Sequence, residues 1–388
     1  MKSRGSILVI VMIILLFTAT ALVAFLDKAS NDLLVDARVI GNNRLRVDAY
    51  SALEVTLAVL ADFREADGGL HSQNEGWGKP LDWAQWTPPT DGRTVDVSFE
   101  DESGKISLNH ITQAQMMSMF ENWNMTEDDA QHLSDVLLVW MRENHIAKVA
   151  PAPDYEQSAI PYDQPTRALR SYDELADIDY ARDQFYDANG RPNDLWWRFR
   201  SDFSLFNYPM PNINGTNQDI VVGLGQFPPT QMDNVTDYLA GKGDFVEPNP
   251  LGVQWFENET QIMNVLGPAG NPKVFGTTIS ALRIFVTVHD GSSQFRLEAV
   301  ISPQGGASTV QTTATDRKKN TQSDNSGESG SQELLPGQIG QDVNNSVPTK
   351  AQISAAQSAN LRFPFTILEI RENNEILTPP PPPPPPPT

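Results

Sequence analysis

The chain has 388 residues, a formal net charge of −21 and no cysteine, and its hydrophobic fraction of 39% permits a folded core. Its length suits two or three domains of about 100–200 residues each. The acidic charge argues against a nucleic-acid partner, because phosphate binding needs clustered Lys and Arg, and the missing cysteines exclude disulfides, thiolate metal sites and a cysteine nucleophile.

The N-terminus joins a short basic leader, residues 1–5, to a segment without charges, residues 6–26. Lys2 and Arg4 favour keeping the leader in the cytoplasm. As a helix the uncharged segment is roughly 31 Å long, at about 1.5 Å per residue, close to the thickness of a bilayer core. The sequence therefore predicts that the N-terminus is a membrane address.

Three interpretations of this address are open on these residues alone. The first is a secretory signal cut at the small residues Ala19-Thr20-Ala21. The second is a permanent single-span anchor. The third is a leader cut between Gly5 and Ser6, with the apolar helix kept on the mature protein, which is the type IV prepilin pattern.

The helical pattern continues through residues 27–67, which contain no proline. Leu53, Leu57, Leu60 and Ala61 are spaced i, i+4, i+7 and i+8, so they form an apolar stripe on one helix face. A secretory signal does not normally continue into so long a helix, so this stretch favours the third interpretation. We expect the stripe to contact partner subunits.

Strand patterns follow, and then helical ones. Residues 94–99 alternate as a half-buried strand, and a second short strand is expected at 106–108. Helices are expected next, with Thr126 as one N-cap and a Ser171–Glu174 capping box opening another. These helices are expected at residues 111–123, 126–143, from 171, at 231–240 and at 259–265.

Strand patterns return near the C-terminus. Residues 284–288 and 294–301 flank a turn and predict a hairpin. The polar, low-complexity stretch 303–360 cannot bury enough apolar surface to fold alone. A further strand is expected within 361–371, and nine consecutive prolines in the tail predict an exposed polyproline II rod.

The expected organisation has eight parts in chain order. They are a leader (1–5), a transmembrane stalk helix (6–26), an amphipathic stalk helix with the first core strands (27–109), an inserted α-helical domain (110–275), a β-hairpin (276–302), a low-complexity insert (303–360), a C-terminal strand (361–371) and a polyproline tail (372–388).

Several collinear segments resemble the general secretion pathway protein K family, the large minor pseudopilins of type II secretion systems. The segment Asp101–Asn109 (DESGKISLN) is very similar to that family's strand–turn–strand signature. The leader, the helix around 52–65, the stretch 133–140 and the segment 155–175 resemble family segments in the same order. The insert and the polyproline tail have no counterpart in this resemblance.

The resemblance implies an α+β fold, in which a pilin-like N-terminal helix packs on an antiparallel sheet that carries a large inserted all-α domain. It implies a minor pseudopilin of the tip complex of the type II secretion pseudopilus, without enzymatic activity. The implied partners are the other minor pseudopilins, the major pseudopilin and a prepilin peptidase that cuts after Gly5. The implied location is the bacterial inner membrane, single-pass, with most of the chain in the periplasm.

Ile10 occupies the fifth position after the expected cut. Most pilin-like subunits carry Glu there, which is thought to neutralise the N-terminal amine of the subunit ahead. The resembled family lacks this Glu. A subunit at the tip of the filament has no subunit ahead of it and therefore does not need the Glu. A plain membrane anchor would explain Ile10 equally well.

No catalytic motif is present in the sequence. The five histidines show no metal-ligand spacing, and there is no nucleophile elbow and no phosphate loop. No cofactor is required by this interpretation; the resemblance leaves room for Ca²⁺ in the helical domain, although no EF-hand loop supports it. The alternative function is a single-span, membrane-anchored envelope binding protein with an acidic ectodomain, using the polyproline tail as a ligand.

Overall fold

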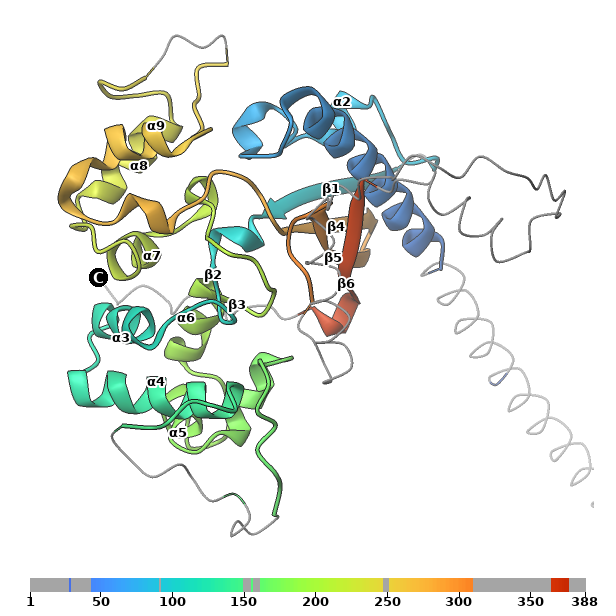
Figure 1. The fold of residues 1–388 in the computed structure, drawn as a ribbon. Coiled ribbons are helices and arrows are strands. Elements are labelled where there is room, and N and C mark those ends of the chain that lie inside the picture. The colour runs from blue at the N-terminus through green and yellow to red at the C-terminus, as the bar shows by residue number, and fades with distance from the viewer. Residues whose placement is uncertain are drawn as a thin grey trace, which may run out of the picture.

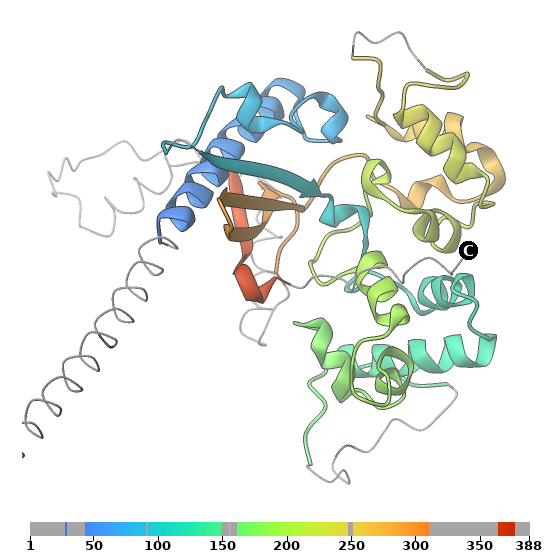
Figure 2. The same cartoon turned by 180° about the vertical axis from the view of Figure 1, so that it is seen from behind.

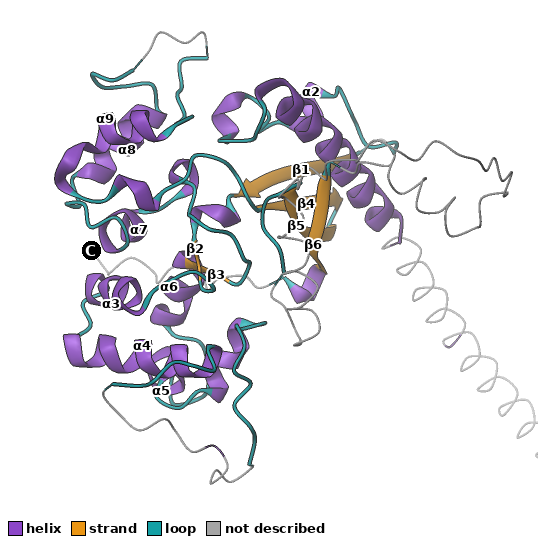
Figure 3. Ribbon diagram, viewed as in Figure 1, coloured by secondary structure: helices purple, strands orange, loops and turns teal. Residues whose placement is uncertain are grey.

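The computed structural model describes Lys28 and residues 43–90, 92–148, 155, 161–246, 251–309 and 364–376. Within them a four-stranded antiparallel sheet lies beside a larger group of helices (Figures 1 and 3). The predicted α+β class is confirmed. The expected site residues Lys2, Arg4, Gly5, Ser6 and Ile10 lie outside the described residues, as do most of the polar insert and the polyproline tail. No helix in the described part is long and apolar enough to cross a membrane.

The N-terminal helix, described over residues 43–67, runs along one face of the sheet (Figure 2). Leu53 and Leu60 are only 3% and 0% exposed, within a core that they share with the sheet. Leu57 and Ala61 are half-buried against the same core. The stripe that we expected to meet partner subunits is covered by the chain's own sheet, so the prediction is wrong for Leu53 and Leu60.

The sheet has the strand order β1 (Arg93–Glu100), β4 (Leu282–Asp290), β5 (Ser293–Pro303) and β6 (Phe365–Glu372), and all neighbours are antiparallel. The predicted strand at 94–99, the hairpin and the C-terminal strand are confirmed. A two-residue turn joins β4 to β5, with Gly291 at φ +58°, the conformation that such hairpin turns require. β6 forms one edge of the sheet.

Alternation along the strands separates the two faces of the sheet. In β4, Leu282, Ile284 and Val286 belong to the core beneath the N-terminal helix. Arg283 therefore points to the opposite face, since successive strand residues alternate. This second face turns toward the helices.

The helical part of the chain lies between β1 and β4. The chain leaves β1 through the 3₁₀ turn η2 (Glu102–Gly104) and β2 (Ile106–Ser107), which pairs in parallel with β3 (Phe203–Ser204). One apolar cluster joins residues from Ile106 to Phe275. The helices of this part are α3 (Gln113–Asn122), α4 (Glu127–Met141), α5 (Ala181–Phe185), α6 (Asp194–Asp202), α7 (Gln218–Gly223), α8 (Gln231–Leu239) and α9 (Glu259–Leu266); the short α2 (Pro80–Trp83) precedes β1.

Most predicted helices are confirmed, and their caps explain where they begin. The Thr126 hydroxyl accepts a hydrogen bond from Asp129 N and caps α4. The helix expected at Ser171 is instead the 3₁₀ helix η4 (Tyr172–Asp177). Glu174 does not close the expected capping box, because it accepts from the Arg167 side chain and from Arg170 N. α6 and α7 were not predicted.

Candidate functional site

The two connections between sheet and helices meet in one place, the junction. Residues 101–105 carry the chain out of β1, and residues 276–281 bring it back into β4. Ser103 of the outgoing connection bonds twice to the returning one: its amide donates to Ala281 O at 3.0 Å, and its hydroxyl accepts from Ser280 N at 2.9 Å. The family-like segment Asp101–Asn109 therefore forms the outgoing half of this junction.

Asn212 adds a third segment to the junction. Its amide donates to Ser103 O at 2.7 Å, and its side-chain nitrogen donates to Asp101 Oδ2 at 2.7 Å and to His71 O at 2.9 Å. Asp101 Oδ1 accepts from the Ser103 hydroxyl at 2.6 Å. Because these bonds join four parts of the chain that are distant in sequence, they fix the helical part relative to the sheet.

Gly104 lies against Gly215 across the junction. A Cβ on Gly104 would come 2.3 Å from Gly215 O and 2.5 Å from its carbonyl carbon, much closer than real contacts allow. The η2 turn and η5 (Ile213–Gly215) can approach so closely only because neither glycine carries a side chain there.

Charged side chains gather on the second face of the sheet, where it meets the junction. The strand register places Glu100, Arg283, Val300 and Glu369 in one row across all four strands. The neighbouring row is Ser98, Phe285, Glu298 and Arg371.

Arg283 is the centre of this charged group. Its Nη2 lies 2.8 Å from Glu102 Oε2, and its Nη1 also pairs with Glu298. Lys105 Nζ lies 3.0 Å from the same oxygen of Glu102, whose other oxygen accepts from Ser204 at 2.7 Å. Glu102 and Glu298 are 0% and 1% exposed.

These neighbours decide the ionisation of Glu102. Burial alone would raise its pKa, but the charges of Arg283 and Lys105, with hydrogen bonds from Arg283 and Ser204, outweigh burial and lower the pKa to about 2. The pKa of Arg283 is raised: burial lowers it, but the carboxylates of Glu102 and Glu298 outweigh that effect. Glu102 and Arg283 are therefore ionised together inside the protein.

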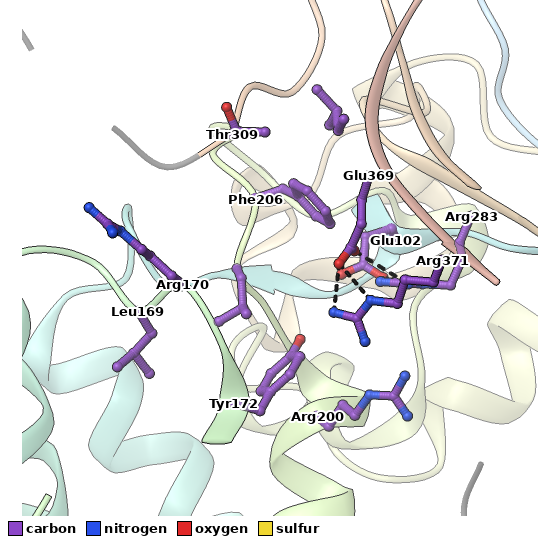
Figure 4. Close-up of a pocket in the computed structure, with 12 residues that line it drawn as sticks. Glu102, Leu169, Arg170, Tyr172, Arg200, Phe206, Arg283, Thr309, Glu369 and Arg371 are labelled. Carbon is purple, nitrogen blue, oxygen red and sulfur yellow. Dashed lines mark hydrogen bonds and ion pairs between the residues drawn. The ribbon is translucent and has the colours of Figure 1, made fainter. Parts of the chain in front are cut away.

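A pocket of about 250 Å³ opens beside this network, between β6 and the helices (Figure 4). Its apolar walls come from Leu169, Leu205, Phe206, Leu368 and the ring of Tyr172. Four arginines and two glutamates also line it, which gives the lining a formal charge of +2 in a strongly acidic chain. They are Arg170, Arg200, Arg283, Arg371, Glu102 and Glu369.

Comparisons with known proteins show a likeness in structure but none in sequence. No family model matches the sequence, and no curated protein matches it. Among solved structures, the chain is similar to a chain in the crystal structure of the GspK–GspI–GspJ complex from the type 2 secretion system of enterotoxigenic Escherichia coli. The TM-score is 0.45 and the identity 14%, over 69% of this chain and 93% of that one. At this score and identity, nothing about the residues or partners of the present chain follows from the match.

The network and the pocket were not found from the sequence. The sequence points to the segment Asp101–Asn109 but not to Arg283 or Glu298. Both stand on a strand face that carries other polar residues, Thr287 and His289 in β4 and Gln294 and Arg296 in β5. Alternation therefore predicts an ordinary polar face at these positions. Arg371 and Arg200 carry no signal either.

No cluster suited to a metal ion occurs in the part of the chain that the structure describes, where no three His, Asp or Glu side chains converge. The acidic residues of the segment 173–183 are spread over η4, α5 and the connection between them. Asp179 forms an exposed ion pair with Arg182, and Asp183 lies 3.6 Å from the same arginine.

Proposed function

We propose that this protein is a non-enzymatic assembly subunit, a minor pseudopilin at the tip of a type II secretion pseudopilus. The observation that carries the proposal is the arrangement of the N-terminal helix. In the sequence this helix follows an uncharged segment of bilayer length, residues 6–26, and in the structure it packs along an antiparallel sheet through Leu53 and Leu60.

The size and position of the helical part support a place at the tip. In the sequence the helical part is inserted between β1 and β4, and in space it lies beside the sheet (Figure 1). A body of this width would obstruct subunits stacked along a filament of packed stalk helices. At the end of the filament it has room.

The junction supports the same role, because a subunit that binds other subunits must hold its helical part in a fixed position relative to its sheet. The hydrogen bonds of Ser103 and Asn212 and the buried pair of Arg283 with Glu102 hold the helical part against the sheet. Ile10 at the fifth position after the proposed cut suits a subunit with no neighbour ahead.

The proposed life cycle follows from these features. A prepilin peptidase cuts between Gly5 and Ser6 and the new N-terminus is methylated. The segment 6–26 holds the protein in the inner membrane, with the acidic bulk in the periplasm, until it joins the smaller minor pseudopilins and primes the major one.

The assembly role is tested by isolating the tagged full chain from its own membranes and sequencing the proteins that accompany it. We expect smaller subunits that begin with a processed prepilin-type N-terminus and that are recovered in fixed ratio. A chain that stays alone, or that brings only proteins without such an N-terminus, would contradict the role.

A further inference from the structure

The edge strand β6 has apolar side chains that the described part of the chain leaves partly exposed. Ile367 and Ile370 are 46% and 39% exposed. They pair in register with Ile301 and Ala299, which belong to the core under the N-terminal helix, so both isoleucines point to that face of the sheet. Within the described residues no strand pairs with the outer edge of β6.

The opposite face of the same strand borders the pocket at the junction. Leu368, Glu369 and Arg371 contribute to its lining (Figure 4). Glu369 and Arg371 are bonded to one another, with Arg371 Nη2 2.6 Å from Glu369 Oε1. One exposed edge thus lies between an uncovered apolar strip and an apolar pocket.

Arg200 gives the pocket a cation that is available to a ligand. Its guanidinium carbon lies 5.7 Å from the ring centroid of Trp197. Among the described residues no carboxylate lies within ion-pairing distance of it. A partner that buried this arginine would have to supply a negative charge, since an unpaired buried charge is costly.

We propose that β6 accepts an added strand from a partner protein, an extended segment with apolar residues on both faces and one Asp or Glu beside the pocket. The main-chain groups of the segment pair with the free edge of β6. Side chains on one face cover Ile367 and Ile370. Those on the other face place an apolar group between Leu205 and Leu368 and a carboxylate near Arg200.

Three observations select this occupant over a helix or an uncharged chain. An extended chain alternates its side chains between the two faces, and only such a chain reaches both the isoleucine strip and the pocket. Long apolar edges are normally covered in folded proteins. The lining charge of +2 complements an acidic residue. The inference stands whether or not the protein is a pseudopilin.

The probe is a labelled peptide of eight residues, the length of β6. Valines occupy one face of it, and leucine and glutamate the other. Binding to the full chain in detergent is followed by fluorescence anisotropy, and hydrogen exchange is measured over β6. We expect saturable binding and slower exchange of the β6 amides.

Two matched peptides test the two parts of the proposal. Replacing the peptide's glutamate by glutamine should weaken binding about tenfold, the effect of about 1.4 kcal/mol. N-methylation of its central residues, which removes main-chain donors, should abolish binding. Equal affinity of all three peptides would overturn the proposal.

Protein variants locate the site. Arg200→Gln should weaken binding of the glutamate peptide and leave the glutamine peptide unaffected, and Ile367→Lys should weaken both. Ile146→Lys, at an isoleucine that is 83% exposed elsewhere on the helical part, is the control and should change neither. The absence of binding at about 1 mM peptide would also overturn the proposal. Binding that leaves the hydrogen exchange of the β6 amides unchanged would overturn it as well.

Discussion

Arg283 in β4 and Glu102 in η2 form an ion pair in the interior, with Arg283 Nη2 2.8 Å from Glu102 Oε2. The two residues are 181 positions apart in the sequence. Their contact joins the sheet to the segment that leads into the helical part. The pair therefore reports directly on whether the junction is formed.

Replacing Arg283 by Met should destabilise the protein by about 3–5 kcal/mol, because the buried Glu102 carboxylate would lose its main partner and the buried side chain of Glu298 would lose its ion-pair partner. The free energy of unfolding of the full chain in detergent measures the effect. Arg182→Ala is the control: Arg182 and Asp179 are about half exposed, and such pairs contribute about 0–1 kcal/mol. Similar losses in both variants would contradict the structural role of Arg283.

Acid should weaken the junction through Glu102. Its pKa is lowered from 4.5 to about 2 in the folded state, so its contribution is present above pH 4.5 and is lost as the pH falls toward 2. The difference in unfolding free energy between the wild type and Glu102→Gln, measured at several pH values, isolates this residue. We expect the difference to shrink below pH 4.5; a constant difference would show that Glu102 is not held ionised.

Gly104→Ala should destabilise the protein by about 1–3 kcal/mol, the usual cost of overpacking, because the new methyl group would meet the backbone of Gly215 at 2.3 Å. Gly78→Ala is the matched control, since its Cβ would find its nearest neighbour at an ordinary 3.5 Å. Thermal unfolding compares the two. A Gly104 variant as stable as the Gly78 variant would mean that the close contact does not exist.

Leu60→Ala should cost about 2–5 kcal/mol, because Leu60 is completely buried between the N-terminal helix and the sheet. Val47→Ala, at a position 64% exposed on the same helix, should change stability by less than about 0.5 kcal/mol. Urea unfolding of both variants tests whether the stripe is intramolecular. If Leu60→Ala left the free energy of unfolding unchanged, the result would favour the original prediction that this stripe contacts a partner subunit.

Local patterns in the sequence predicted much of the fold. The alternation at 94–99 and the spacing of Leu53, Leu57 and Leu60 each reflect one buried face, so β1 and the N-terminal helix could be inferred. α6 and α7 were missed for a local reason as well. Their N-caps are Asn193 and Asn217, and asparagine in a stretch rich in Pro and Gly is as typical of a loop as of a helix N-cap.

The candidate site could not be predicted in the same way. Which surface covers an apolar stripe is decided by tertiary packing, and the stripe pattern is the same for a sheet of the same chain as for a partner helix. The pairing of Arg283 with Glu102 depends on how the chain returns from the helical part, a path set by long-range contacts such as Ser103 with Ala281. The spacing of residues along the sequence predicts neither the surface that covers the stripe nor the pairing of Arg283 with Glu102.

The most direct test of the proposed role is the intact mass of the protein purified from its own membranes. We predict a mature chain that begins at Ser6, having lost residues 1–5, and that carries one additional methyl group at its N-terminus. A chain cut after Ala21, or one that keeps its first residue, would contradict the assignment as a pseudopilin.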